Sequence, residues 1–162
     1  MTTDQFWKII DDAREEDGDC EAVAARVKSA LEGLNPDDIL GFSRELEKRR
    51  AESYRWDLWA VAYIVNGGCS DDGFEYFRGW LIAKGRSYFE AALADPVRAA
   101  DGAAPDANEC EDILYVASST YESKTGSYPP DSDIPFPKEP AGEPWEEDEL
   151  QLRYPKLWER FT

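Results

Sequence analysis

The chain contains no histidine among its 162 residues. Histidine is the side chain that most often acts as a general base near neutral pH, that activates serine or cysteine nucleophiles, and that binds zinc. Its absence removes the usual routes to nucleophilic and zinc-dependent catalysis. Ser70, for example, could be activated only by a lysine or a carboxylate.

Cysteine is scarce as well, because only Cys20, Cys69 and Cys110 occur and no two of them have CxxC spacing. The absence of a CxxC pair argues against a structural zinc site. An odd number of widely separated cysteines fits a reducing cytosol better than a disulfide framework. Cys69 follows a glycine pair at an expected helix start, where a thiol has a lowered pKa, but no base accompanies it as a nucleophile.

Long apolar runs are also missing. Residues 1–10 show no apolar segment typical of a signal peptide, and no later run approaches the length that spans a bilayer. We therefore expect no membrane segment and a cytoplasmic location.

Acidic side chains, in contrast, are abundant, and the formal net charge is −17. Residues 101–162 alone hold 15 acidic and 5 basic side chains. Such a chain repels phosphate backbones, which argues against nucleic acid as a partner. The charge favours a protein with a basic surface, a cation or a small ligand, and its simplest reading is a solvated surface.

Apolar residues make up 42% of the chain, enough for a core, and they recur with helical spacing. Asn35-Pro36 is a helix start signal, with asparagine as the cap and proline in the first turn. Other helices are expected from a cap at Thr3 or Asp4, from Asp19, over 56–65, from about 70 to 85, over 87–94 and over about 108–124. We predict an all-α fold, a compact irregular bundle.

The apolar run at residues 56–65 has no polar face, which places it at the centre of the bundle. A buried strand is the alternative, but the alanines and the length favour helix. Residues 127–144 include six prolines and predict an extended strap. Residues 145–162 are too apolar for a free tail, so we expect a short helix that docks back on a single domain spanning 1–162.

Three carboxylates, Asp71, Asp72 and Glu75, lie within one turn of an expected helix. They could bind a hard cation such as magnesium, or supply an acid and a base. The simpler interpretation is that Ser70, Asp71 or Asp72 caps the helix, with Asp72 and Glu75 at capping-box spacing. We predict no metal and no cofactor.

Arg78 and Trp80 follow on the same helix. Arg78 could pair with Glu75 at i, i+3, or it could point into a cleft and bind an anionic ligand. Gly79 between them costs roughly 1 kcal/mol relative to alanine in a helix. That cost predicts the close approach of another backbone, most simply that of the helix at 56–65.

Arg55 and Asp57 flank the start of the central apolar helix. A carboxylate next to such a segment needs a fixed partner if it is buried, and Arg55, Arg78 or Arg86 could supply one. A shifted pKa at Asp57 would suit catalysis, although structural ion pairs produce the same pattern.

Four segments, at residues 6–11, 54–63, 70–82 and 154–158, resemble a bacterial family known only as a domain of unknown function. Some members carry a fused Trp-Gly-Arg-type domain. The most specific segment reads S-D-D-G-F-x-Y-F-R-G-W-L-I from residue 70. The resemblance implies no reaction, and the positions that match its signature are Asp71, Asp72, Phe74, Arg78, Gly79 and Trp80.

These features lead to two hypotheses. The first is a non-catalytic protein- or ligand-binding module that regulates a partner. The alternative is a metal-assisted hydrolase or small-molecule enzyme that uses the carboxylates at 71–75. The candidate binding residues are Asp71, Asp72, Glu75, Arg78, Trp80, Asp57 and Arg55.

Overall fold

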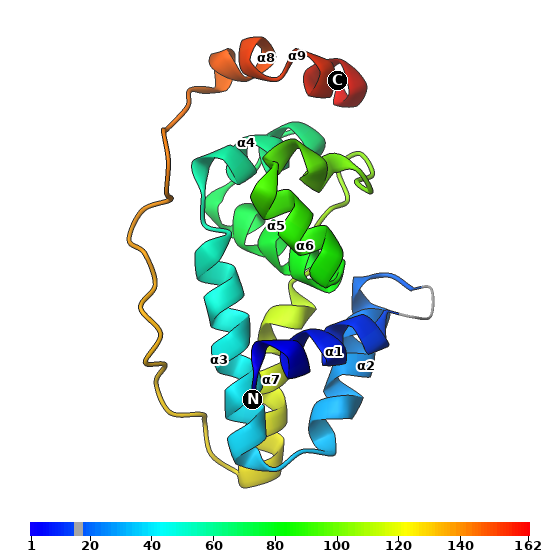
Figure 1. The fold of residues 1–162 in the computed structure, drawn as a ribbon, viewed down its shortest axis with the longest axis vertical. Coiled ribbons are helices and arrows are strands. Elements are labelled where there is room, and N and C mark those ends of the chain that lie inside the picture. The colour runs from blue at the N-terminus through cyan, green and yellow to red at the C-terminus, as the bar shows by residue number, and fades with distance from the viewer. Residues whose placement is uncertain (15–17) are drawn as a thin grey trace.

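The computed structural model of the protein describes residues 1–14 and 18–162, and within them the regular elements are helices, with no β-strand (Figure 1). The prediction of an all-α fold is confirmed. In chain order the elements are α1 (Thr3–Ala13), α2 (Cys20–Glu32), α3 (Pro36–Glu52), α4 (Trp56–Val65), α5 (Asp71–Ala83), α6 (Arg86–Ala94), the 3-10 helix η1 (Pro96–Ala100), α7 (Asp112–Thr125), the 3-10 helix η2 (Glu147–Glu149), α8 (Leu150–Arg153) and α9 (Pro155–Phe161).

The helix starts follow local capping chemistry. The Asn35 side chain accepts a hydrogen bond from the Asp38 backbone at 2.9 Å, with Pro36 in the first turn of α3, as predicted. Asp19 caps α2 in the same way. The prediction for α1 was wrong by one residue, because Thr2 is its cap and forms a reciprocal capping box with Gln5.

Helix α4 has the bounds that the apolar run predicted, and the alternative of a strand is wrong. Its side chains from Leu58 to Val65 are buried apart from Trp59 and Tyr63, which are half-buried. The helix packs against α5, η1 and α9, so several elements cover it. A helix without a polar face is stable only when it is covered in this way.

The helices are arranged in two groups (Figure 1). Helices α1, α2, α3 and α7 form the lower part of the view, and α4, α5 and α6 lie above them. Helix α7 packs against α2, α3 and α5 and so connects the two groups. Its first residue is Asp112, four positions later than predicted, because Asn108 and Cys110 belong to the preceding loop.

The strap, residues 127–144, runs along one side of the molecule beside α3 (Figure 1). Near its end, the Ala141 N–H donates to the Tyr54 carbonyl and the Trp56 N–H donates to the Ala141 carbonyl, both at 2.9 Å. Beyond it, the Trp145 indole donates to the Trp56 carbonyl at 2.7 Å. Helices α8 and α9 then lie over α4, with Leu150 and Leu157 buried.

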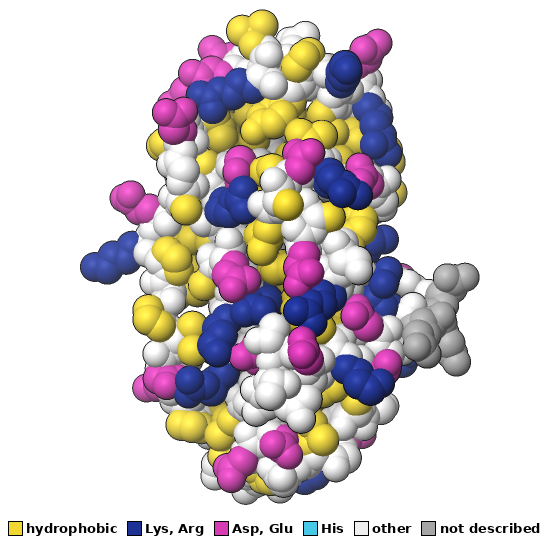
Figure 2. All heavy atoms as spheres, in the orientation of Figure 1, with side chains coloured by type: hydrophobic (Ala, Val, Ile, Leu, Met, Phe, Trp, Pro, Cys, Tyr) yellow, Lys and Arg dark blue, Asp and Glu magenta, His cyan; other side chains and the backbone are white. Residues whose placement is uncertain are grey.

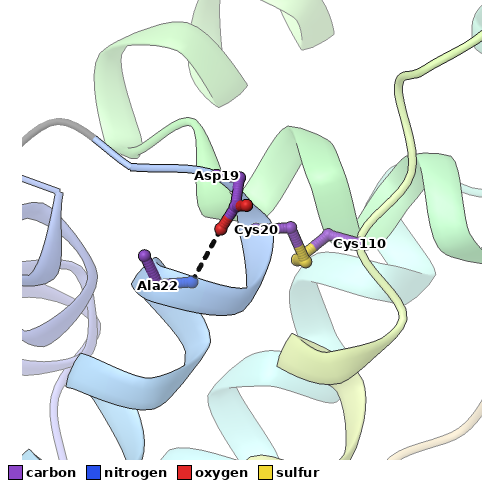
Figure 3. The surroundings of a disulfide bond; sticks show 4 residues. All are labelled: Asp19, Cys20, Ala22 and Cys110. Carbon is purple, nitrogen blue, oxygen red and sulfur yellow. Dashed lines mark hydrogen bonds between the residues drawn. A yellow bond between two sulfur atoms is a disulfide. The ribbon is translucent and has the colours of Figure 1, made fainter.

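The cysteine prediction is wrong, because Cys20 and Cys110 form a disulfide (Figure 3). Cys20 is the first residue of α2 and Cys110 lies in the loop before α7, 90 positions away in the sequence. The packing of α2 on α7 brings them together, and spacing along the chain gives no sign of it. Cys69 keeps a free thiol.

No helix in the described parts of the chain has the length and apolar character needed to cross a membrane. The predicted cytoplasmic location stays a prediction, and it loses the support that it drew from unpaired cysteines.

Candidate functional site

Helix α5 places Asp71, Glu75 and Arg78 on one face, because residues spaced by four and three positions share a helix face. Ser70 is the cap, since its hydroxyl accepts from the Gly73 N–H at 3.1 Å. Asp71 and Asp72 are exposed in the first turn, where carboxylates favour the positive end of the helix. The predicted capping box from Asp72 to Glu75 is not formed.

Glu75 points instead to α3, where it forms an ion pair with Arg50. Both side chains are largely covered, with 30% and 23% of their surfaces exposed. The ion pair connects α3 to α5 and occupies the carboxylate that was one possible partner of Arg78. Arg78 therefore has no ion pair with Glu75.

Arg78 is enclosed by aromatic rings. Its side chain is 3% exposed, and its guanidinium carbon lies 4.5 Å from the centre of the Phe74 ring and 4.7 Å from that of Tyr54. A third ring, Phe136 of the strap, lies 5.9 Å away. Cation–π attraction at these distances stabilises the charge without supplying a hydrogen-bond acceptor. We call Arg50, Tyr54, Phe74 and Arg78 the arginine cage.

Hydrogen bonding in the cage is incomplete. Nε and Nη1 of Arg78 and Nε of Arg50 are buried without a hydrogen-bond partner. Within residues 1–14 and 18–162, every buried side-chain nitrogen or oxygen without a partner belongs to Arg49, Arg50 or Arg78. A buried donor that has lost water without gaining an acceptor costs about 1–3 kcal/mol, and more when the group is charged. The cage thus presents donors that lack an acceptor.

Burial, followed by the nearby positive charge of Arg50, lowers the pKa of Arg78 to about 10. The guanidinium is still charged at neutral pH. Burial also raises the pKa of Tyr54, and the carboxylate of Asp71 adds to this effect. The tyrosine therefore remains a neutral hydroxyl beside a charged arginine.

Cys69 does not have the lowered thiol pKa that its position at a helix start predicted. Burial, followed by the negative charge of Glu109, raises the pKa of the thiol to about 12. Desolvation of the thiol and the nearby carboxylate both raise the pKa, and together they outweigh the lowering expected from the positive end of the helix. Cys69 is therefore a thiol, and not a thiolate, at neutral pH.

The other candidate residues lie elsewhere. Trp80 points to a different face of α5 from Arg78 and packs edge-on against Tyr88, with centroids 5.7 Å apart. Arg55 and Asp57 pair with each other, with Nη2 and Oδ2 2.7 Å apart, and Arg55 also donates to the Leu93 carbonyl. The structure brings Asp71, Glu75 and Arg78 together but not Asp72, Trp80, Arg55 or Asp57.

Gly79 has the close backbone neighbour that its position in a helix predicted. A Cβ atom at this residue would lie 2.3 Å from the carbonyl oxygen of Cys110. The neighbour is thus the loop before α7, and the prediction of α4 was wrong. The Cys110 N–H also donates to the Tyr76 carbonyl at 2.9 Å, which holds this loop on α5.

The carboxylates at residues 71–75 do not form a metal site. Among the described residues, no group of three or more histidine, cysteine, aspartate or glutamate side chains is placed to hold a metal ion. Glu75 is engaged by Arg50, and its two neighbours are exposed at the helix start. The metal-assisted alternative stays a prediction, and the described residues offer it no clustered donor set.

Sequence reasoning missed Arg50, Tyr54 and Phe136. Arg50 is one of several charged residues near the end of α3, and Phe136 lies in the proline-rich strap, so neither position showed a sign of the cage. The visible face of the molecule mixes dark-blue basic and magenta acidic side chains with yellow apolar ones (Figure 2). The negative net charge is therefore not one continuous acidic field on that face.

A family model described as a protein of unknown function (DUF4240) matches residues 1–123. This span holds the whole arginine cage, and the strap lies beyond it. No curated protein and no solved structure matches the chain.

Proposed function

We propose that this chain, which belongs to the DUF4240 family of proteins of unknown function, is a non-catalytic binding module that holds an anionic group of its ligand at the arginine cage. The observation that carries this proposal is Arg78, which is 3% exposed while Nε and Nη1 lack acceptors. A ligand oxygen would supply what the protein does not. A buried charged donor without a partner is unfavourable. Because Arg78 is already out of water in the free protein, binding of a ligand oxygen adds a hydrogen bond without a further desolvation cost for the donor.

The charge of the surroundings favours a carboxylate over a phosphate. Asp71 and Glu75 lie near enough to Arg78 to affect its pKa, and the chain as a whole carries −17. A doubly charged phosphate is repelled more strongly than a singly charged carboxylate in such a field. The guanidinium plane also matches the geometry of a carboxylate.

A binding role without catalysis agrees with what surrounds the cage. The chain has no histidine, and the Cys69 thiol has a pKa of about 12. Arg78 therefore has no histidine base and no activated thiol beside it. The groups in direct contact with Arg78 are aromatic rings, and a charged donor among aromatic rings is a common arrangement for ligand recognition.

The proposal can be tested by titrating wild-type protein with sodium acetate or sodium benzoate against sodium chloride at constant ionic strength. We expect the melting temperature to rise with the carboxylates and not with chloride, because a ligand that binds only the folded state stabilises it. Tryptophan fluorescence gives a second readout, since Trp59 stacks on Phe74 with centroids 4.9 Å apart.

Arg78→Met should abolish both responses. Arg86→Met is the matched control, because Arg86 pairs with Asp4 and Glu90 at the surface and should leave both responses intact. A wild-type melting temperature that changes equally in acetate and chloride would show that the cage does not bind carboxylates.

A further inference from the structure

The strap already places a ligand-like segment on α3. Residues 131–137 read Asp-Ser-Asp-Ile-Pro-Phe-Pro and have no helical structure (Figure 1). Pro135 and Pro137 flank the one aromatic residue of this segment. Proline restricts the chain before binding, so an extended segment of this kind loses little further entropy when it docks.

Three side chains of the segment contact α3 in ways that peptide recognition commonly uses. Both carboxylate oxygens of Asp133 accept from Nη1 of Arg44, at 2.7 and 2.8 Å. The Ser132 hydroxyl donates to Glu47. The contacts join a carboxylate to an arginine and a hydroxyl to a carboxylate, and they fix the register of the segment.

Phe136 makes the third contact and covers the arginine cage. Its ring centre lies 5.4 Å from that of Tyr54, and the guanidinium carbon of Arg50 lies 5.8 Å from it. The guanidinium carbon of Arg78 lies 5.9 Å from the same ring centre, so the Phe136 ring lies over both arginines of the cage. It covers them without offering an oxygen to their unpaired N–H groups.

The segment is held weakly. The side chains of Arg44 and Asp133 are 51% and 65% exposed, and exposed ion pairs contribute only about 0–1 kcal/mol. Phe136 is 44% exposed. A cavity of about 400 Å³ lies between α3, α7 and strap residues 129–133, so the strap does not lie flush on the helices.

The two ends of the strap are fixed more firmly than its middle. It leaves α7 at Gly126, and it is anchored again by the paired backbone hydrogen bonds of Ala141 and by Trp145. A tethered segment acts as a competitor at an effective concentration of about millimolar. Its middle can therefore leave α3 while both ends stay attached.

Resting on the proposed function, we infer that residues 131–137 are an intramolecular competitor for the arginine cage. The true occupant is an acidic, proline-containing segment of a partner protein that presents a carboxylate and an aromatic ring with the spacing of Asp133 and Phe136. That segment displaces the strap, places its ring on Tyr54 and Arg50, and pairs its carboxylate with Arg44, as Asp133 does in the strap. Because the strap competes for the same surface, it raises the concentration of partner segment that is needed for binding.

The test uses full-length protein and a fluorescent synthetic peptide of residues 129–138 as the probe. We expect this peptide to bind the double variant Asp133→Asn/Phe136→Ala at least about tenfold more tightly than wild type by anisotropy, because the competitor has been weakened. A peptide carrying the same two substitutions should bind neither protein. Asp131→Asn is the matched control, since it removes a carboxylate of the same segment that makes none of these contacts, and this variant should bind the probe like wild type.

Equal affinity of the probe for wild type and for the weakened-strap variant would overturn the inference. So would retained tight binding after Arg50→Met is added to that variant. The inference would also be overturned if wild type formed a concentration-dependent dimer that the probe dissociates, because the occupant would then be a second copy of the chain. If acetate still stabilises wild type while the probe fails, the proposed function stands and only the competitor role is lost.

Discussion

The guanidinium carbon of Arg78 lies 4.5 Å from the centre of the Phe74 ring, one helical turn earlier in α5. The ring attracts the charge, but it cannot accept the hydrogen bonds that Nε and Nη1 have lost on burial. The arginine is therefore held in place and left unsatisfied at the same time. This combination separates the effect of Arg78 on stability from the binding role that we propose for it.

Replacing Arg78 with methionine should raise the free energy of unfolding by about 1–3 kcal/mol, because a buried charge without acceptors is replaced by an apolar side chain of similar length. Urea denaturation measures the change. Arg86→Met, which removes a half-buried arginine that has carboxylate partners, should produce no gain. A clear loss of stability in Arg78→Met would mean that the rings compensate the charge fully.

The gain from Arg78→Met should depend on pH. The pKa of Arg78 is lowered to about 10 in the folded protein, below the value of more than 12 in an unfolded chain. Between these values the unfolded chain binds the proton and the folded protein does not, so wild type gains stability with rising pH relative to the variant. The difference should be constant below about pH 10 and shrink above it. A difference that does not change with pH would contradict the lowered pKa.

Cys69 should react slowly in the folded protein. With a thiol pKa of about 12, its thiolate is rare at pH 8, and alkylation by iodoacetamide should be at least about 100-fold slower than in denaturant. Glu109→Gln should accelerate the reaction, because the Glu109 charge raises this pKa. Glu122→Gln, an exposed carboxylate on α7, should leave the rate unchanged. Mass spectrometry of quenched samples measures it, and a fast native reaction would refute the burial argument.

The disulfide should contribute substantially to stability. It joins Cys20 to Cys110 across a separation of 90 residues, and bridges of such length typically stabilise by about 2–5 kcal/mol. Reductant should therefore shift the urea midpoint of wild type to lower concentration. The double variant Cys20→Ala/Cys110→Ala should have the lower urea midpoint both with and without reductant. An identical midpoint in all samples would show that the bridge adds nothing.

Gly79→Ala should destabilise the protein by about 2–3 kcal/mol, although alanine is the better helix former by roughly 1 kcal/mol. The added Cβ would lie 2.3 Å from a backbone oxygen, which cannot move away as a flexible side chain can. Gly33→Ala is the control, because the nearest atom to its Cβ would be 3.5 Å away. That variant should be neutral or slightly more stable by thermal denaturation, and similar losses in both would contradict the steric explanation.

Much of the fold was predictable because helix formation depends on neighbours within one or two turns. Asn35-Pro36 started α3, and the run from Trp56 to Val65 formed α4 with the expected bounds. The close contact at Gly79 was predictable too, since glycine inside a helix has a cost that needs a reason. Its neighbour was not, because the sequence gives no distance between α5 and the loop before α7.

The sequence by itself determined an all-α chain with a proline-rich strap and marked Arg78 as a residue of interest. Only the tertiary structure decided that Glu75 turns to Arg50, that Phe136 stands over Arg78, and that Cys20 meets Cys110. Each of these contacts joins residues far apart in the chain. Capping and periodicity act locally, whereas such pairs are set by how all the helices pack at once, and no local pattern encodes that arrangement.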